Sequence, residues 1–180
     1  MRNKKIQKIR TESLSMTTYQ PRTNNQGPTT KINYLCSIKS TERMIYITRR
    51  ERFCAAHKLS HPEWDATKNL EVFGPCSNEN WHGHNFDLYV TVKGEVNPDT
   101  GFVVNLKDLS PLIKEKVIDK LDHKNINLDV DFMKGKMAST EVLAIEIWKQ
   151  LSAPIKAIGV ELHCIKVQET ENNFVEYFGE

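Results

Sequence analysis

The segment Cys76-Ser-Asn-Glu-Asn-Trp-His82-Gly-His84-Asn85 places a thiol and two imidazoles immediately before an alternating run. That run, Phe86-Asp-Leu-Tyr-Val-Thr-Val92, changes between apolar and polar residues and predicts a β-strand. Because strand side chains alternate between two faces, we expect His82 and His84 to point to the same side of the sheet. Gly83 has no side chain and leaves the opposite face bare between them.

A third histidine stands upstream, in Phe53-Cys-Ala-Ala-His57, at the end of a strand predicted to begin at Met44. Two imidazoles need a further ligand to hold a metal. Three neutral imidazoles with no fixed fourth ligand are typical of a catalytic zinc ion that keeps one position open for water or substrate. The sequence therefore predicts a zinc site at His57, His82 and His84, the alternative being ordinary surface or core histidines.

Cys76 lies six residues before His82, too far to share its strand and near enough to arch over the metal. A thiolate beside Zn²⁺ and a histidine is a usable base or nucleophile. The alternative is a fourth, structural zinc ligand that would close the site. Structural sites favour several cysteines in CxxC-type pairs, and this chain has no such pair.

Two further positions carry candidate chemistry. Asp122 and His123 follow an amphipathic helix predicted over Asn105–Leu121, where the helix dipole favours a protonated imidazole and the carboxylate can orient it as an acid–base relay. Such a pair can also simply cap a helix. Glu169 ends a strand predicted over 160–169. A carboxylate there can accept two parallel N–H bonds from an amino-pyrimidinone ring, although spacing alone favours an exposed strand-end charge.

The composition of the chain indicates its general class of protein. The chain has 180 residues, 39% hydrophobic and 27% charged, which is ordinary for a soluble protein with one domain. No apolar run approaches a membrane span. Four cysteines without framework spacing predict free thiols in a reducing compartment and a cytoplasmic protein. Residues 44–180 carry 16 basic against 21 acidic side chains, which argues against a nucleic-acid binder.

Residues 1–43 differ from the rest, with nine basic against two acidic side chains and no sustained periodicity. Such a segment cannot bury enough apolar surface to offset its ordering entropy, so we expect a disordered basic extension before a folded domain over 44–180. Two alternatives are a mitochondrial presequence in Met1–Arg10 and a functional product that starts at Met44.

The domain pattern continues with a long loop expected over 58–81 and a hairpin strand expected over 102–105. A second helix is expected to begin after Ser139 as its N-cap, and Pro154 to lie in the connection that follows. The last strand is expected over 174–177. This order predicts an α+β domain with an antiparallel β-sheet and two helices on one face.

Six short segments stand in a characteristic order. They are Phe-Cys-Ala-Ala-His57, Cys76-x₅-His82-Gly-His84-Asn85, Asn105-Leu-Lys-Asp-Leu109, Leu121-Asp-His-Lys-Asn125, Ser-Thr-Glu141 and Glu169-Thr-Glu-Asn-Asn173. In these segments the chain resembles the 6-pyruvoyl-tetrahydropterin synthase family from Met44 to Glu180, and residues 1–43 lie outside the resemblance.

The resemblance implies a tunnelling fold, in which the sheets of a trimer join into a barrel and two trimers form a homohexamer. It implies a carbon–oxygen lyase of tetrahydrobiopterin biosynthesis. The implied reaction is the zinc-dependent conversion of 7,8-dihydroneopterin triphosphate to 6-pyruvoyl-tetrahydropterin with elimination of triphosphate, with Mg²⁺ assisting the triphosphate. The alternatives are 6-carboxy-tetrahydropterin synthase activity on the same substrate and a non-catalytic pterin-binding homologue.

The resemblance also implies roles for zinc ligands, proton-transfer groups and pterin contacts. The zinc ligands would be His57, His82 and His84; Cys76 would be the base and Asp122 with His123 its relay; Glu169 would anchor the pterin, with Thr140 and Glu141 lining its pocket. The spacing of Cys76 and the paired Asn172 and Asn173 favour the pyruvoyl enzyme over the carboxy enzyme. Two departures from the family pattern are Cys54, where a small hydroxyl is usual, and Val142, where Asn is frequent.

Overall fold

The computed structural model describes residues 43–180. The disordered extension expected over residues 1–43 therefore falls, except for Arg43, outside the described residues. Within the described range, no helix combines the length and the apolar character that crossing a membrane requires.

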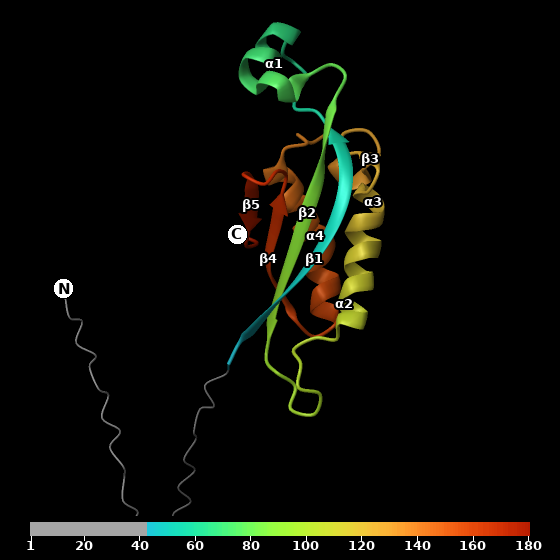
Figure 1. Cartoon of the computed structure of the whole chain (residues 1–180), viewed down its shortest axis with the longest axis vertical. Coiled ribbons are helices and arrows are strands. Elements are labelled where there is room, and N and C mark those ends of the chain that lie inside the picture. Colours follow the sequence, from blue (N-terminus) through green and yellow to red (C-terminus); the bar gives the residue numbers. More distant parts are fainter. Residues whose placement is uncertain (1–42) are drawn as a thin grey trace, which may run out of the picture. The chain divides into compact units, whose positions relative to one another are not determined.

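In residues 43–180, five strands form one sheet in the order β3-β1-β2-β4-β5 (Figure 1). The long strands β1 (Ile45–His57) and β2 (His82–Gly94) pair antiparallel along their whole length. β4 (Glu161–Gln168) pairs antiparallel with β2, and β5 (Phe174–Tyr177) with β4. The two-residue strand β3 (Lys124–Asn125) lies parallel to β1, so the prediction of a purely antiparallel sheet is wrong. β3 follows β1 only after β2 and the helical residues 106–121, so it is free to run parallel to β1, unlike a strand joined to it by a hairpin turn.

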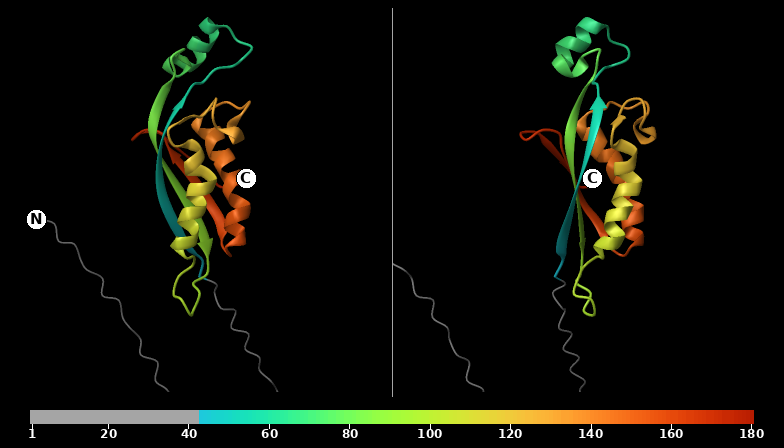
Figure 2. Two further views of the ribbon diagram at one scale, coloured as in Figure 1. Left: turned by 90° about the vertical axis from the view of Figure 1, so that its right-hand side faces the viewer. Right: turned by 45° about the vertical axis from the view of Figure 1, so that its right-hand side comes forward.

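The main helices lie on one face of the sheet, as predicted (Figures 1 and 2). α2 (Leu106–Ile113) continues through the π-helical turn η2 (Lys114–Ile118) into α3 (Asp119–Leu121). The Asn105 side chain accepts a hydrogen bond from the Lys107 N–H and forms the N-cap of the helix predicted to begin here. The last helix, α4 (Thr140–Ala157), follows the short 3₁₀ turn η3 (Asp131–Met133) and lies beside α2, on the same face of the sheet.

Helix α4 also begins as predicted, because the Ser139 side chain accepts a hydrogen bond from the Val142 N–H. Its end differs from the prediction: Pro154 lies inside the helix rather than in the following connection. Proline costs an interior helix one hydrogen bond. Leu151 and Ile155 on either side are fully buried, and their packing against the core stabilises the helix on both sides of the proline.

Residues 58–81 are not an unstructured loop. They contain α1 (Ala66–Phe73), capped by the Asp65 side chain, and the 3₁₀ turn η1 (Gly74–Ser77). The prediction is wrong here because Leu70 and Val72 are exposed, so that α1 has no buried apolar face for periodicity to reveal. We name residues 58–81 the Cys76 loop.

The hairpin strand expected over 102–105 is also absent from the described structure, where these residues form a bend that leads into α2. Strand β2, its expected partner, already pairs with β1 on one edge and with β4 on the other. No edge of β2 is therefore left for a further strand.

The core lies between the sheet and the helices. Its largest fully buried side chains are Phe86, Leu88, Leu109, Ile113, Leu121, Ile126, Met133, Leu143, Ile147, Leu151, Ile155 and Ile165. Phe86 and Leu88 of β2 point to the helix face, and alternation places His84 and His82 on that same face. The helix-covered face of the sheet therefore has core side chains along its middle and the histidines at one end.

Candidate metal and substrate site

Three histidine rings meet where β1 ends and β2 begins. His57 is paired directly with His82, and His84 lies opposite Ala55 one step along the same face. One ring nitrogen of each histidine can be chosen so that all three lie within 4.8 Å of one another. Cys76 is not part of this group. In residues 43–180 these histidines are the one set of potential ligands close enough to share a metal ion.

The hydrogen bonds of the histidines suit metal binding. The Nδ1 atom of His57 lies 2.8 Å from the carbonyl oxygen of Ala138, which can only accept, so Nδ1 carries the proton and Nε2 keeps its lone pair. Nε2 of His57 and both ring nitrogens of His82 are buried without a hydrogen-bond partner in the described structure. Buried polar atoms are normally satisfied, and a metal ion would satisfy these.

Burial lowers the pKa values of His57, His82 and His84 below the ordinary value of a histidine, because a charged imidazole would lose its hydration at these buried positions. The neutral imidazole is the form that binds a metal. The geometry, the free lone pairs and the neutral state of these rings together fit a metal ion.

Gly83 makes the close approach of the two histidine-bearing strands possible. A Cβ atom at this position would lie 2.9 Å from the carbonyl oxygen of Ala55, a backbone atom that cannot swing aside. Any larger residue would push β1 and β2 apart beside His82 and His84.

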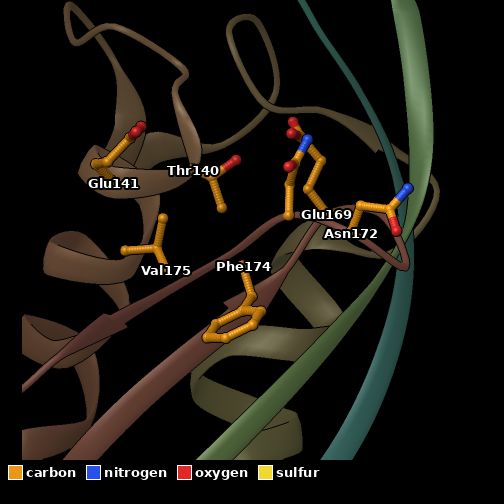
Figure 3. Close-up of a pocket in the computed structure, with 7 residues that line it drawn as sticks. Thr140, Glu141, Glu169, Asn172, Phe174 and Val175 are labelled. Carbon is orange, nitrogen blue, oxygen red and sulfur yellow. The ribbon is translucent and has the colours of Figure 1, made fainter.

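Glu169 connects the histidines to a cavity. Its Oε1 atom lies 3.3 Å from Nε2 of His57 and 3.7 Å from Nε2 of His84. It also lines a cavity of about 370 Å³, in which Thr140 and Glu141 come from the first turn of α4 (Figure 3). The structure thus brings together the three residues expected to bind a pterin.

The opposite wall of this cavity was not expected from the sequence. It comes from the turn between β4 and β5 and from the start of β5, and its residues are Asn172, Asn173, Phe174 and Val175 (Figure 3). The turn itself lies between the strands predicted over 160–169 and 174–177. Its position opposite the first turn of α4 depends on the path of the whole chain. The local sequence therefore contains no signal that would predict this position.

Cys76 lies in η1, at the end of the sheet where the histidines lie. It is partly exposed and free. Its carbonyl oxygen accepts a hydrogen bond of 2.8 Å from the Leu59 N–H, which joins the two ends of the Cys76 loop.

Asp122 and His123 form the expected pair, with 3.0 Å between Oδ2 of Asp122 and Nδ1 of His123. The Cys54 N–H donates to Oδ1 of Asp122 at 2.8 Å and thereby lowers the pKa of this carboxyl group. The His123 N–H donates to the Cys54 carbonyl at 2.6 Å and holds His123 at a φ of 58°, in the left-handed region. The His123 side chain is 82% exposed.

This pair does not meet the histidine cluster within one chain. Asp122 lines the open face of the sheet together with Cys54 and Asn85, which are paired across β1 and β2. Strand alternation points Cys54 away from His57. Asp122 therefore lies at the outer edge of β1, bound to the backbone of Cys54, and borders the open face of the sheet.

Comparison with known proteins identifies the family to which this chain belongs. The family model described as 6-pyruvoyl tetrahydropterin synthase matches residues 46–180. The 6-pyruvoyl tetrahydrobiopterin synthase of Dictyostelium discoideum is 44% identical over 138 residues, covering 77% of this chain and 98% of that protein. The Homo sapiens protein of the same name is 42% identical over 134 residues, with coverage of 74% and 91%.

A solved structure agrees with these sequence relatives. The Caenorhabditis elegans 6-pyruvoyl tetrahydropterin synthase superposes with a TM-score of 0.70 at 32% identity, covering 77% of this chain and 97% of that one. The family model, the two relatives and this structure all extend over most of the described residues. The chain belongs to the 6-pyruvoyl tetrahydropterin synthase family.

Proposed function

We propose that this chain converts 7,8-dihydroneopterin triphosphate to 6-pyruvoyl-tetrahydropterin with elimination of triphosphate, as a carbon–oxygen lyase of tetrahydrobiopterin biosynthesis. The observation that carries the proposal is the position of Glu169, which lines the cavity and approaches two of the three clustered histidines. A pterin held by this carboxylate would have its side chain beside a metal. The names of the relatives point to the same chemistry.

His57, His82 and His84 would hold a zinc ion, which supplies Lewis-acid polarisation of substrate hydroxyl groups when bound. Glu169 would accept two N–H bonds from the pterin edge, and Thr140 and Glu141 would border the ring. The Cys76 thiolate would abstract a proton from a side-chain carbon of the substrate. Triphosphate then leaves with the electron pair of the broken C–O bond, and the later steps are tautomerisations.

We further propose that Asp122 and His123 serve the site of a neighbouring subunit, because they are bound at the outer edge of β1 and make no contact with the three histidines in the described structure. The sheet can extend to such a neighbour. β1 is thirteen residues long, and within residues 43–180 the strand pairing on its outer edge is limited to Ala55 and Ala56, with β3. β5 forms the other edge. Pairing of these open edges would join three sheets into the barrel of a trimer, and two trimers would form a homohexamer.

Three further parts of the proposal concern the setting of the reaction. Mg²⁺ would assist the triphosphate, since it binds phosphate oxygens while keeping several waters. The cysteines of the described residues are all free, which supports a cytoplasmic location. The catalytic domain would span residues 44–180, in agreement with the family match over 46–180.

The test is to incubate the purified zinc-loaded protein with 7,8-dihydroneopterin triphosphate and follow both triphosphate release and the mass of the pterin product. We expect triphosphate and a 6-pyruvoyl product, both lost when the zinc is removed by a chelator. A 6-carboxy product would replace the proposal by the related synthase activity. Tight binding of the pterin without triphosphate release would show a non-catalytic homologue.

A further inference from the structure

The start of the Cys76 loop is held by one side chain from another part of the chain. Oδ1 of Asn127 accepts a hydrogen bond of 3.0 Å from the Lys58 N–H, and Nδ2 of Asn127 donates one of 2.9 Å to the Lys58 carbonyl. Both backbone polar groups of a single residue are thus bound by one amide. Lys58 directly follows His57, the last residue of β1.

The amide of Asn127 extends the pairing of β1 with β3. Backbone pairing between these strands ends at Ala56 and Asn125, followed by a bond of 2.8 Å from the Ile126 N–H to the Ala56 carbonyl. Asn127 then continues the contact with its side chain instead of its backbone. Its own N–H donates to Oδ1 of Asn125 at 3.0 Å, which fixes the backbone from which the amide extends.

This contact is the hydrogen-bonded anchor of the Cys76 loop. Helix α1 packs on η1, and both stand beyond the end of the sheet (Figures 1 and 2). Apart from its two flanking strands, the loop is hydrogen-bonded within residues 43–180 to the rest of the fold through Asn127 alone. The bond from Leu59 to Cys76 transmits the anchored position of Lys58 to the turn that carries the thiol.

We infer that Asn127 is a positioning residue for Cys76, an inference that rests on the proposed role of Cys76 as the base. Asn127 sets the position of the Lys58 peptide, and Leu59 is the next residue of the chain. The Leu59 N–H in turn binds the carbonyl oxygen of Cys76 and so fixes its backbone. A misplacement of a reacting group by about 1 Å can cost about 100-fold in rate. Loss of the amide should therefore slow proton abstraction while the metal and pterin contacts persist.

The experiment compares Asn127→Ala, which removes both hydrogen bonds, with Asn127→Asp, which keeps the acceptor for the Lys58 N–H. The matched control is Asn97→Ala, because Asn97 accepts from the Asp99 and Thr100 N–H groups in a turn at the other end of β2. We expect kcat to fall about 10- to 100-fold in Asn127→Ala with KM within about twofold, less in Asn127→Asp, and unchanged in Asn97→Ala.

Hydrogen–deuterium exchange supplies a readout that does not depend on activity. In Asn127→Ala the Leu59 amide should exchange faster, while residues 86–92 of β2 exchange as in the unchanged protein. An unchanged kcat, an unchanged exchange rate at Leu59, or equally faster exchange in β2 would overturn the inference. Should Asn127→Ala fail to fold, Asn127→Asp provides the same comparison. If Cys76→Ala is fully active, the role of the thiol is wrong, and exchange at Leu59 still tests the anchor.

Discussion

The Nδ1 atom of His57 lies 2.8 Å from the carbonyl oxygen of Ala138, one residue before the cap of α4. This contact fixes the ring of a candidate metal ligand. The next residues of the chain, Thr140 and Glu141, line the candidate substrate cavity. The same turn therefore orients one ligand of the candidate metal site and borders the candidate substrate cavity, so that the positions of the two are fixed relative to each other.

His82→Ala should lower the zinc content sharply and abolish turnover, because two imidazoles hold a metal weakly. Both ring nitrogens of His82 are buried without a partner, so the side chain makes no other hydrogen bond in the described structure that its loss would break. Elemental analysis of the purified variant measures the effect. The control is His61→Ala, since His61 stacks on Trp64 outside the cluster. Full zinc occupancy in His82→Ala would contradict the ligand assignment.

Cys76→Ala should keep its zinc, its fold and its affinity for substrate, yet turn over about 10²- to 10⁴-fold more slowly, since that is what a positioned base contributes. Zinc content, melting temperature and single-turnover rate are measured on one preparation. Cys54→Ser serves as the control, because Cys54 is exposed on the opposite face. Loss of zinc together with loss of stability would instead identify Cys76 as a structural ligand.

Mixed oligomers test whether the site is shared between subunits. Cys76→Ala and Asp122→Asn should each be nearly inactive alone, and oligomers reassembled from both should regain part of the activity. Some sites would then combine an intact Cys76 from one subunit with an intact Asp122 from another. Asparagine keeps an acceptor for the Cys54 N–H, so the local fold should persist. If one chain supplied the whole site, no mixture of the two variants would be active.

Gly83→Ala should lower the free energy of unfolding by about 1–3 kcal/mol and weaken metal binding, because the new Cβ atom would be forced against the Ala55 carbonyl. Chemical denaturation and titration of the apoprotein with Co²⁺ measure the two effects. At the other end of the same strand, a Cβ on Gly94 would meet the Val103 side chain, which can move. Gly94→Ala should therefore cost less and leave Co²⁺ binding intact; equal effects of the two variants would refute the argument.

Glu146 is 5% exposed and lies 2.9 Å from Nζ of Lys136 and 2.7 Å from Nζ of Lys149. Burial alone would raise the pKa of this carboxyl group, but the two lysine bonds outweigh it and lower the pKa below its ordinary value of 4.5. A lowered pKa in the folded state stabilises the fold above the unfolded value and loses this contribution as pH falls through the folded value.

Glu146→Gln should therefore be less stable than the unchanged protein at pH 7, by about 1–3 kcal/mol, with a difference that shrinks below about pH 5. Urea denaturation of both proteins at several pH values measures this difference. A constant difference down to pH 3 would show that the carboxylate charge makes no net contribution.

Several parts of the fold follow from local pattern. The alternation before His57 and after His84 predicts β1 and β2, and a histidine pair two residues apart on a strand must share a face. Asn105 and Ser139 cap their helices because a short polar side chain needs only the next few backbone N–H groups. These properties depend on neighbours in the sequence, and the structure confirms them.

Other parts depend on which edges and faces remain free once the chain has folded. Residues 102–105 have a strand-like composition but no open edge of β2 to join, and Pro154 stays helical because its neighbours are buried. Asp122 follows its helix as expected, yet the path of the chain puts it at the outer edge of β1, away from the histidine cluster. Backbone hydrogen bonds and buried area are shared between distant segments, so no local pattern contains this information.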